Sequence, residues 1–236
     1  MKRISLRRLA RHLADDLFRL ESPLIRTFVE LTYRPGLVAR NYVNGRRRCY
    51  TNPLKYCLLV FAVYGITYLL WAPPLPELEW VESDGPIPPW WIMFADSHES
   101  YYLHLEYFME RHGTITSLAL LPLLALASKL SFFNRNLNFA EHTVLMLYVQ
   151  AQITLLTLPF SPYLDENEWA LLAVLLIVLV FWLTACQQFF TGSTIAKQLR
   201  GLLAAGLMLT VTLVAMFGVA WLVLFYFWRF HGLVPG

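Results

Sequence analysis

Residues 54–72 read LKYCLLVFAVYGITYLLWA, a run whose single charged side chain, Lys55, stands next to its start. A helix of about 20 predominantly apolar residues spans a bilayer core of roughly 30 Å. The charges on the two sides of this run differ in sign. Residues 1–55 hold 13 Lys and Arg residues and 4 acids, whereas residues 73–113 hold 8 acids and 1 base. Because basic segments next to a span stay in the cytoplasm, the pattern predicts a membrane protein with its N-terminus inside.

The rest of the chain repeats this apolar character. Of its 236 residues, 57% are hydrophobic and 15% are charged, compared with about 25% charged residues in soluble domains. The connections near Arg135, Lys197 and Arg200 carry bases, whereas the connection over residues 161–168 carries only acids. We therefore predict an all-α integral membrane bundle with the N-terminus in and the C-terminus out. Its five transmembrane helices are expected at about 54–72, 114–133, 142–160, 169–189 and 202–228.

The charged N-terminal part forms a region of its own, residues 1–53, ahead of the transmembrane domain over 54–236. Leucines recur at helical spacing between Leu6 and Leu20, with arginines elsewhere on the wheel, as in basic amphipathic helices that lie in a membrane interface. The alternative is that this stripe packs on the cytoplasmic ends of the spans. Residues 73–113 form an outer loop, with a Pro-rich first half and a helix from about residue 97 to 111.

Several residues with special backbone properties lie between residues 34 and 54. Pro35-Gly36 is interpreted as a turn before a short helix over 37–44, and Gly45 supplies a left-handed end to that helix. Asn52 is predicted to cap the first span, with Pro53 in its first turn.

Three consecutive arginines, Arg46, Arg47 and Arg48, fall at headgroup height just before the first span. Because a guanidinium can bind a phosphate through two parallel hydrogen bonds, we predict that these residues bind an anionic lipid headgroup. The alternative is anchoring by positive charge without headgroup specificity. A basic segment beside a span favours lipid over nucleic acid as the partner, and no nucleic-acid motif is present.

The same segment resembles a family of bacterial membrane proteins known only as a domain of unknown function, DUF3667. The resemblance rests on Pro35-Gly36, Tyr42, Gly45-Arg46, Tyr50 and Pro53-Leu54, with a second match at Glu141-His142, and so extends over about residues 20–160. Many members of the family carry an N-terminal zinc ribbon. This chain has three cysteines, Cys49, Cys57 and Cys186, with no CxxC pair, so neither the ribbon nor a disulfide is expected. The family name implies no activity.

The predicted spans contain a small set of polar residues. Glu141 and His142 are potential metal ligands, but Asn138-x-x-Glu141 also fits a capping box, and no metal or cofactor is predicted. Gln150 and Gln152 are interpreted as amides that hydrogen-bond a neighbouring helix, with the face of Gln150 turned to the interior. The alternative is that this polar site, Glu141, His142, Gln150 and Gln152, lines a substrate path.

No nucleophile motif, phosphate-binding loop or dinucleotide turn is found in the sequence. We therefore expect an accessory or scaffolding protein of the bacterial cytoplasmic membrane that contacts anionic lipid and other subunits or a second copy of itself, with a non-enzymatic role favoured. The alternative function is a small transporter or lipid-handling enzyme whose cytoplasmic-side site joins the three arginines to Glu141, His142 and Gln150.

Overall fold

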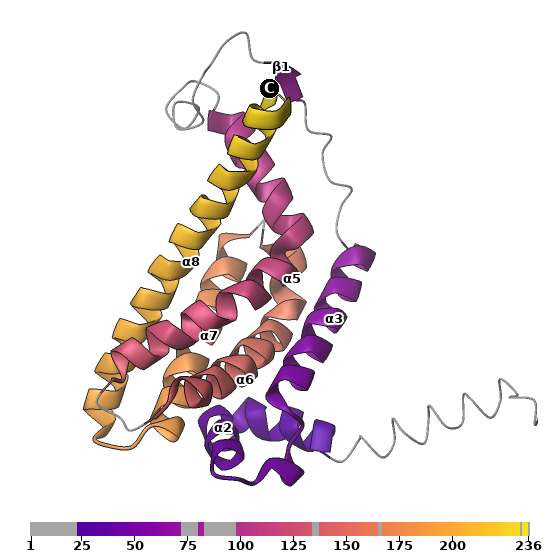
Figure 1. The fold of residues 1–236 in the computed structure, drawn as a ribbon. Helices are drawn as coiled ribbons and strands as arrows, with labels where there is room; N and C mark the ends of the chain where they lie inside the picture. The colour runs from indigo at the N-terminus through magenta and orange to yellow at the C-terminus, as the bar shows by residue number, and fades with distance from the viewer. Residues whose placement is uncertain are drawn as a thin grey trace, which may run out of the picture.

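The computed structural model describes residues 23–71, 80–82, 98–133, 137–164, 167–231 and 233–235. The first element among the described residues is a helix over residues 23–33, which carries no label in Figure 1. The labelled elements that follow are α2 (Pro35–Val43), η1 (Arg47–Cys49), α3 (Pro53–Trp71), β1 (Trp80–Glu82), α5 (His98–Ser131), α6 (Phe139–Thr157), η2 (Leu158–Tyr163), α7 (Glu168–Phe189), α8 (Thr194–His231) and β2 (Leu233–Pro235).

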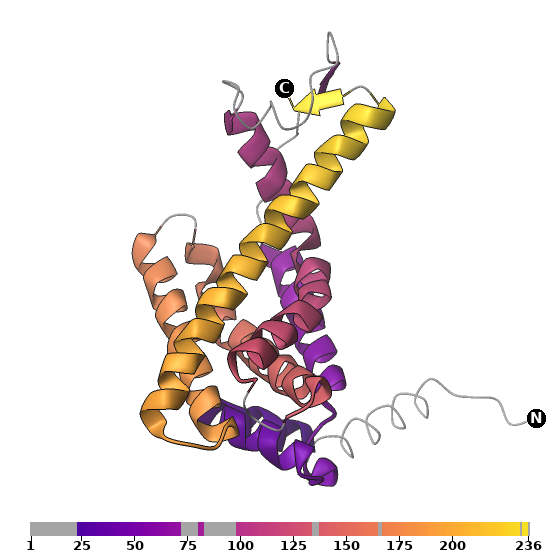
Figure 2. The same cartoon turned by 60° about the vertical axis from the view of Figure 1, so that its left-hand side comes forward.

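The long helices stand side by side and alternate in direction (Figures 1 and 2). Helices α3, α6 and α8 run away from the end of the molecule where α2 lies, and α5 and α7 run back toward it. Helix α6 contacts α2, α3, α5 and α7, so it is the central helix. We call the helix over 23–33, α2 and η1 together the basal helices, because they lie across one end of the bundle. The C-terminus lies at the opposite end.

The all-α prediction is confirmed, and each of the five predicted spans coincides with a helix. Among the described residues, three helical stretches are long and apolar enough to cross a membrane: Phe139–Tyr163, Glu168–Phe189 and Thr194–Val219. The stretch Ile115–Ser131 of α5 is a shorter apolar helix. These findings indicate a membrane protein.

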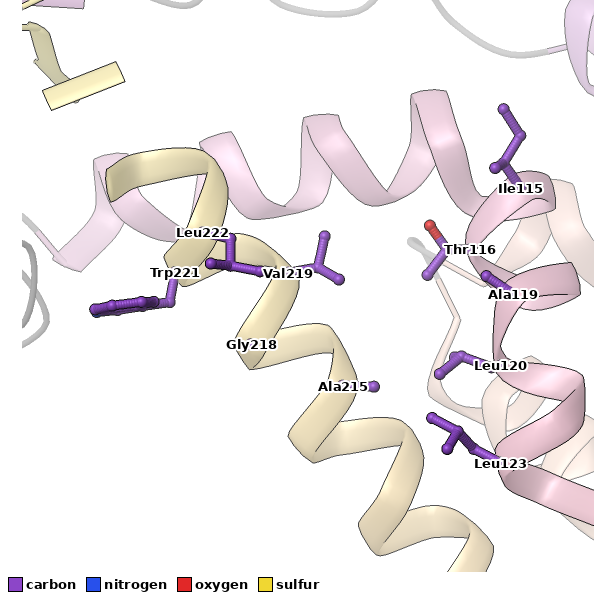
Figure 3. A pocket seen from close by; sticks show the side chains of 10 residues that line it. All are labelled: Ile115, Thr116, Ala119, Leu120, Leu123, Ala215, Gly218, Val219, Trp221 and Leu222. Atoms are coloured by element: carbon purple, nitrogen blue, oxygen red, sulfur yellow. The ribbon is translucent and has the colours of Figure 1, made fainter. Parts of the chain in front are cut away.

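Two features of the region between α3 and the second predicted span differ from the prediction. The surface helix expected near residues 97–111 and the span expected from residue 114 are one continuous helix, α5, which changes direction near Ile115 (Figure 3). In addition, β1 and β2 form a short antiparallel pair, with Val81 opposite Val234. The predicted helix over Leu6–Leu20 and most of the Pro-rich part of the outer loop lie outside the described residues.

Local signals set the helix boundaries as expected. Asn52 accepts hydrogen bonds from the backbone of Leu54 and Lys55 and so caps α3, which begins at Pro53. The capping box at the start of α6 is also confirmed: the Asn138 side chain accepts from the Glu141 N–H at 2.9 Å, and the Glu141 carboxylate accepts from the Asn138 N–H at 2.7 Å. Such a box satisfies two backbone donors that the helix itself leaves free.

Candidate functional site

The basal helices are attached to α7 by a close contact at Gly36. The interpretation of Pro35-Gly36 as a turn is wrong, because both residues belong to the first turn of α2. A Cβ at Gly36 would meet the backbone of Ala185 and Phe189, and the N–H groups of Gly36 and Leu37 donate to the Gln188 side chain at 3.1 and 3.4 Å. The glycine is therefore needed for close approach between two helices, and Gln188 satisfies donors at the N-terminus of α2.

A second set of contacts fixes the chain where it leaves the basal helices. The Tyr50 hydroxyl donates to the Glu30 carboxylate at 2.7 Å, and the Arg26 guanidinium donates to the other oxygen of that carboxylate at 2.7 Å. Partial burial opposes the charge on Glu30, but the hydrogen bonds from Tyr50 and Arg26 outweigh it and lower the pKa of Glu30 below its ordinary value. Burial and the bond to Glu30 raise the pKa of Tyr50.

Hydrogen bonds from buried side chains then connect this segment to the core. The Thr51 N–H donates to the Thr27 hydroxyl at 2.9 Å, and the Tyr148 hydroxyl of α6 donates to the Thr51 carbonyl at 2.6 Å. The rings of Tyr148 and Tyr42 meet edge to face, with centroids 5.8 Å apart, a favourable arrangement for an aromatic pair. Helix α6 thus holds both α2 and the start of α3 in place.

Gln152 is the amide of α6 that forms hydrogen bonds to neighbouring helices. It is fully buried, it accepts from the Tyr56 hydroxyl of α3, and its NH₂ group donates to the Thr32 hydroxyl at 2.9 Å. The expectation that the Gln150 face is the interior one is wrong. Residues two positions apart in a helix are separated by about 200° around its axis. Because Gln152 faces the interior, Gln150 lies on the other side of α6, where it is half-buried. Thr154, which follows on the Gln150 face, donates to the backbone of its own helix.

The three arginines predicted to bind lipid lie together on the surface of the basal helices. Arg46, Arg47 and Arg48 are all exposed. Gly45, with φ +96°, ends α2 and turns the chain into η1, so the left-handed position predicted for this glycine is confirmed. The Arg47 guanidinium lies 5.8 Å from the centre of the Tyr42 ring, within the range of a cation–π contact. We call these three residues the arginine patch.

Other cations lie at the same end of the bundle. Exposed or half-buried bases stand on the basal helices and on the adjoining ends of α3, α5 and α8: Arg26, Arg34, Arg40, Lys55, Lys129, Lys197 and Arg200. Lys197 donates to the Gln187 carbonyl at 2.8 Å. The acids that the structure describes at this end are Glu30, paired with Arg26, and Glu141, which caps α6. Positive charge therefore dominates the described surface at this end.

Glu141 and His142 are neighbours in sequence, but their side chains have separate environments. Glu141 is held in the capping box, whereas His142 is fully buried. The Nδ1 atom of His142 lies 2.9 Å from the Ser128 hydroxyl of α5, and its ring lies 5.5 Å from the ring of Phe190. Its Nε2 atom is buried and has no hydrogen-bond partner among the described residues. Within those residues, no group of three metal-ligating side chains forms.

Two pockets among the described residues bear on the predicted polar site, and none of its four residues lines either of them, although Thr32 of the second pocket accepts a hydrogen bond from Gln152. The first, about 750 Å³, opens between α5 and α8, where Ala119 and Leu123 face Ala215 and Val219 (Figure 3). The second, about 380 Å³, is lined by α7 together with Thr32 and Pro35 of the basal helices. Neither lining includes the arginine patch, Glu141, His142, Gln150 or Gln152.

The comparison with protein families covers the basal helices and the first part of α3. Residues 21–65 match the family described as Protein of unknown function (DUF3667). The resemblance is therefore confirmed over these residues. No curated protein and no solved structure matches the chain. In this DUF3667 segment the motif residues have structural roles: Gly36 contacts α7, Tyr42 packs on Tyr148, Gly45 ends α2 and Tyr50 bonds Glu30.

Some contacts of this site were not anticipated from the sequence. Tyr148 and Gln188 hold the basal helices, yet neither was singled out. A signal for Gln188 does exist, because Gln187-Gln188 is a polar pair at the end of a long apolar run. Tyr148 carries no such signal, because tyrosine is common in apolar helices of every kind.

Proposed function

We propose that this chain is an integral membrane accessory or scaffolding protein that contacts anionic lipid through its arginine patch and other subunits through its membrane helices. In this proposal the protein has five spans, its N-terminus and basal helices lie in the cytoplasm, and it belongs to the inner membrane of a bacterium. It has no catalytic role.

The observation that carries the proposal is an exposed arginine patch on a rigid support. The three guanidiniums are accessible, while the segments on both sides of them are fixed by the close contact at Gly36 and by the Tyr50–Glu30 hydrogen bond. Each Lys or Arg near an anionic membrane surface contributes about 1 kcal/mol to attraction. A fixed group of three such residues is therefore a suitable contact for acidic headgroups.

The arrangement of the helices supports the five-span topology. The basal helices, the end of α5, the start of α6 and the α7–α8 connection lie at one end, and β2 lies at the other. This end also carries the bases Lys129, Lys197 and Arg200. Positive charge on the connections at one end of a bundle favours a cytoplasmic location for that end.

Helix α8 supports the contact with other subunits. Within the apolar stretch Thr194–Val219 of α8, only 6% is buried inside the chain, compared with 39% in the stretch Phe139–Tyr163. Its face toward α5 opens into the apolar pocket of Figure 3, where Gly218 has open space in front of it. Small residues on such a face allow another helix to approach closely.

The described residues do not favour the alternative of a transporter or lipid-handling enzyme. That function requires the arginine patch, Glu141, His142 and Gln150 to share one site. Instead, Glu141 caps α6 at the surface, His142 is buried beside Ser128, and Gln150 lies on the opposite side of α6 from the bridging Gln152.

The test replaces all three arginines of the patch in the full-length protein. In mixed vesicles of phosphatidylglycerol and phosphatidylcholine, we expect the wild-type protein to co-purify with an excess of phosphatidylglycerol. The change Arg46→Gln, Arg47→Gln, Arg48→Gln removes about 3 kcal/mol of attraction at most, on the order of a hundredfold in binding. The excess should fall, and the unfolding temperature should stay unchanged because the three side chains are exposed.

The matched control replaces the same three residues by lysine. It keeps the charge but removes the planar fork that binds a phosphate through two hydrogen bonds. If the lysine variant keeps the excess of phosphatidylglycerol, charge is responsible for the contact. If the lysine variant loses this excess, the hydrogen-bond geometry of the guanidiniums is responsible. An unfolded glutamine variant, or an unchanged excess of phosphatidylglycerol, would contradict the proposal.

A further inference from the structure

The 380 Å³ pocket on α7 is a groove with an apolar wall, and the basal helices contribute the rest of its lining. Its wall consists of Leu176, Ile177, Val180, Phe181 and Thr184, and the basal helices close it with Thr32 and Pro35. The volume lies within the about 300–1,000 Å³ typical of ligand pockets.

The groove offers apolar contact rather than free hydrogen-bond donors. The Thr184 hydroxyl donates to the Val180 carbonyl at 2.8 Å, and the Thr32 hydroxyl donates to the Phe28 carbonyl at 2.9 Å. Both hydroxyl hydrogens are therefore engaged within their own helices, and Pro35 has no N–H group. These properties suit a hydrocarbon chain better than a polar solute.

The length of the groove fits part of one acyl chain. From Leu176 to Thr184 the wall extends over eight residues of α7, which is about 12 Å. This is somewhat less than one leaflet of a hydrocarbon core roughly 30 Å thick. The basal helices close the groove at the end where the described surface is basic, which is the end that a headgroup would reach.

Charge selects the kind of lipid. Arg34 is exposed and is the chain neighbour of Pro35, which lines the groove, although Arg34 itself is not part of the lining. Its charge also helps to lower the pKa of Glu30. Other cations surround this end of the bundle, whereas its described acids, Glu30 and Glu141, are engaged in contacts of their own. A phosphate without a compensating ammonium complements this surface.

We infer that the groove between α7 and the basal helices binds one acyl chain of an anionic phospholipid, with the headgroup at Arg34. The inference rests on the proposed function and adds to it a defined place for one lipid molecule. It also explains why the apolar face of α7 stays open beside the basal helices: the lipid completes the packing there.

The test counts the phospholipids that stay bound to the full-length protein, by native mass spectrometry from mild detergent after addition of phosphatidylglycerol or phosphatidylcholine with identical chains. We expect one phosphatidylglycerol to be retained at least tenfold better than phosphatidylcholine. Val180→Trp fills the groove and should abolish this retention. Leu172→Trp is the matched control, because Leu172 is as exposed as Val180, 55% in each case, but does not line the groove.

A second pair of variants tests the headgroup. Arg34→Gln should reduce the preference for phosphatidylglycerol, whereas Lys129→Gln, which removes an exposed cation at the same end but away from the groove, should preserve it. To avoid dependence on any variant, a phosphatidylglycerol with a photoreactive acyl chain can be cross-linked to the wild-type protein. The label should appear between Leu176 and Thr184.

The outcomes separate the inference from the proposed function. If the arginine-patch variant loses phosphatidylglycerol while Val180→Trp retains it as well as Leu172→Trp does, the groove is not the site and the proposed function stands. Equal retention of both lipids by the wild-type protein would contradict both. Cross-links confined to other helices would contradict the inference alone.

Discussion

At the scale of single residues, Gly36 allows a close contact between α2 and α7. A Cβ there would lie 2.6 Å from the backbone nitrogen of Phe189, whereas a Cβ at Gly65 would meet nothing within 4 Å. Backbone atoms cannot move aside as a flexible side chain can, so the two glycines should respond to substitution in opposite ways.

We expect Gly36→Ala to destabilise the protein by about 1–3 kcal/mol, the usual cost of overpacking. The matched change Gly65→Ala should stabilise it by about 0.5–1 kcal/mol, because alanine is the better helix former. Thermal unfolding of both variants in the same detergent is the measurement. A Gly36→Ala variant as stable as the wild type would show that α2 does not pack on α7 as described.

The Glu30 carboxyl gives the basal helices a dependence on pH. Burial opposes the charge of Glu30, but the hydrogen bonds from Tyr50 and Arg26 outweigh burial and lower its pKa in the folded state. In the unfolded state, a Glu side chain has a pKa of about 4.3. The unfolded state therefore takes up a proton first as the pH falls. The stability contributed by Glu30 is complete above the unfolded pKa and is lost as the pH falls through the folded pKa.

We expect Glu30→Gln to be less stable than the wild type at neutral pH and to lose less stability on acidification to about pH 3. Tyr50→Phe removes the hydrogen bond from Tyr50 to Glu30. This variant should also be less stable at neutral pH and lose less stability on acidification. Tyr163→Phe is the control, because Tyr163 is 59% exposed. Unfolding temperatures at both pH values test this, and parallel losses in Glu30→Gln and the wild type would refute it.

At the scale of elements, α6 organises the bundle through polar side chains on its buried face, among them Gln152. Gln152 connects α6 to Tyr56 of α3 and to Thr32 of the helix over 23–33. Gln150, two residues earlier, is half-buried. The two amides therefore form a matched pair within one helix, equal in chemistry and different in position.

We expect Gln152→Leu to lower stability clearly more than Gln150→Leu. Loss of a hydrogen bond inside a membrane protein costs about 0.6 kcal/mol on average, and Gln152→Leu also leaves the buried Tyr56 hydroxyl unpaired, which adds about 1–3 kcal/mol. Unfolding of both variants in detergent, with a cellular complementation assay, is the measurement. A stable but inactive Gln150→Leu variant would favour a substrate path over a structural role.

At the scale of the whole molecule, the charge of the connections and the alternation of the helices point to the same orientation. We expect a reporter that is active only outside the cytoplasm to be active when fused after Gly236, and a cytoplasmic reporter to be silent there. Fusions within the α7–α8 connection, near Gly192, should give the reverse pattern. Equal signals at both positions would mean that the number of spans between them is even.

The sequence alone was sufficient for features that depend on neighbours along the chain. The caps at Asn52 and Asn138 and the left-handed Gly45 each involve residues within five positions of one another, so a short segment contains all the information. The apolar runs likewise predicted where long helices lie, because a bilayer requires length and apolarity rather than particular partners.

Only the tertiary structure decided which side chains meet. Gly36 and Gln188 are 152 residues apart, and Gln152 and Thr32 are 120 apart. Helix α6 is apolar around most of its circumference, as suits a helix in lipid, so its sequence does not distinguish the buried face from the exposed one. The choice of Gln152 over Gln150, and the separation of His142 from Glu141, therefore follow from how the helices pack.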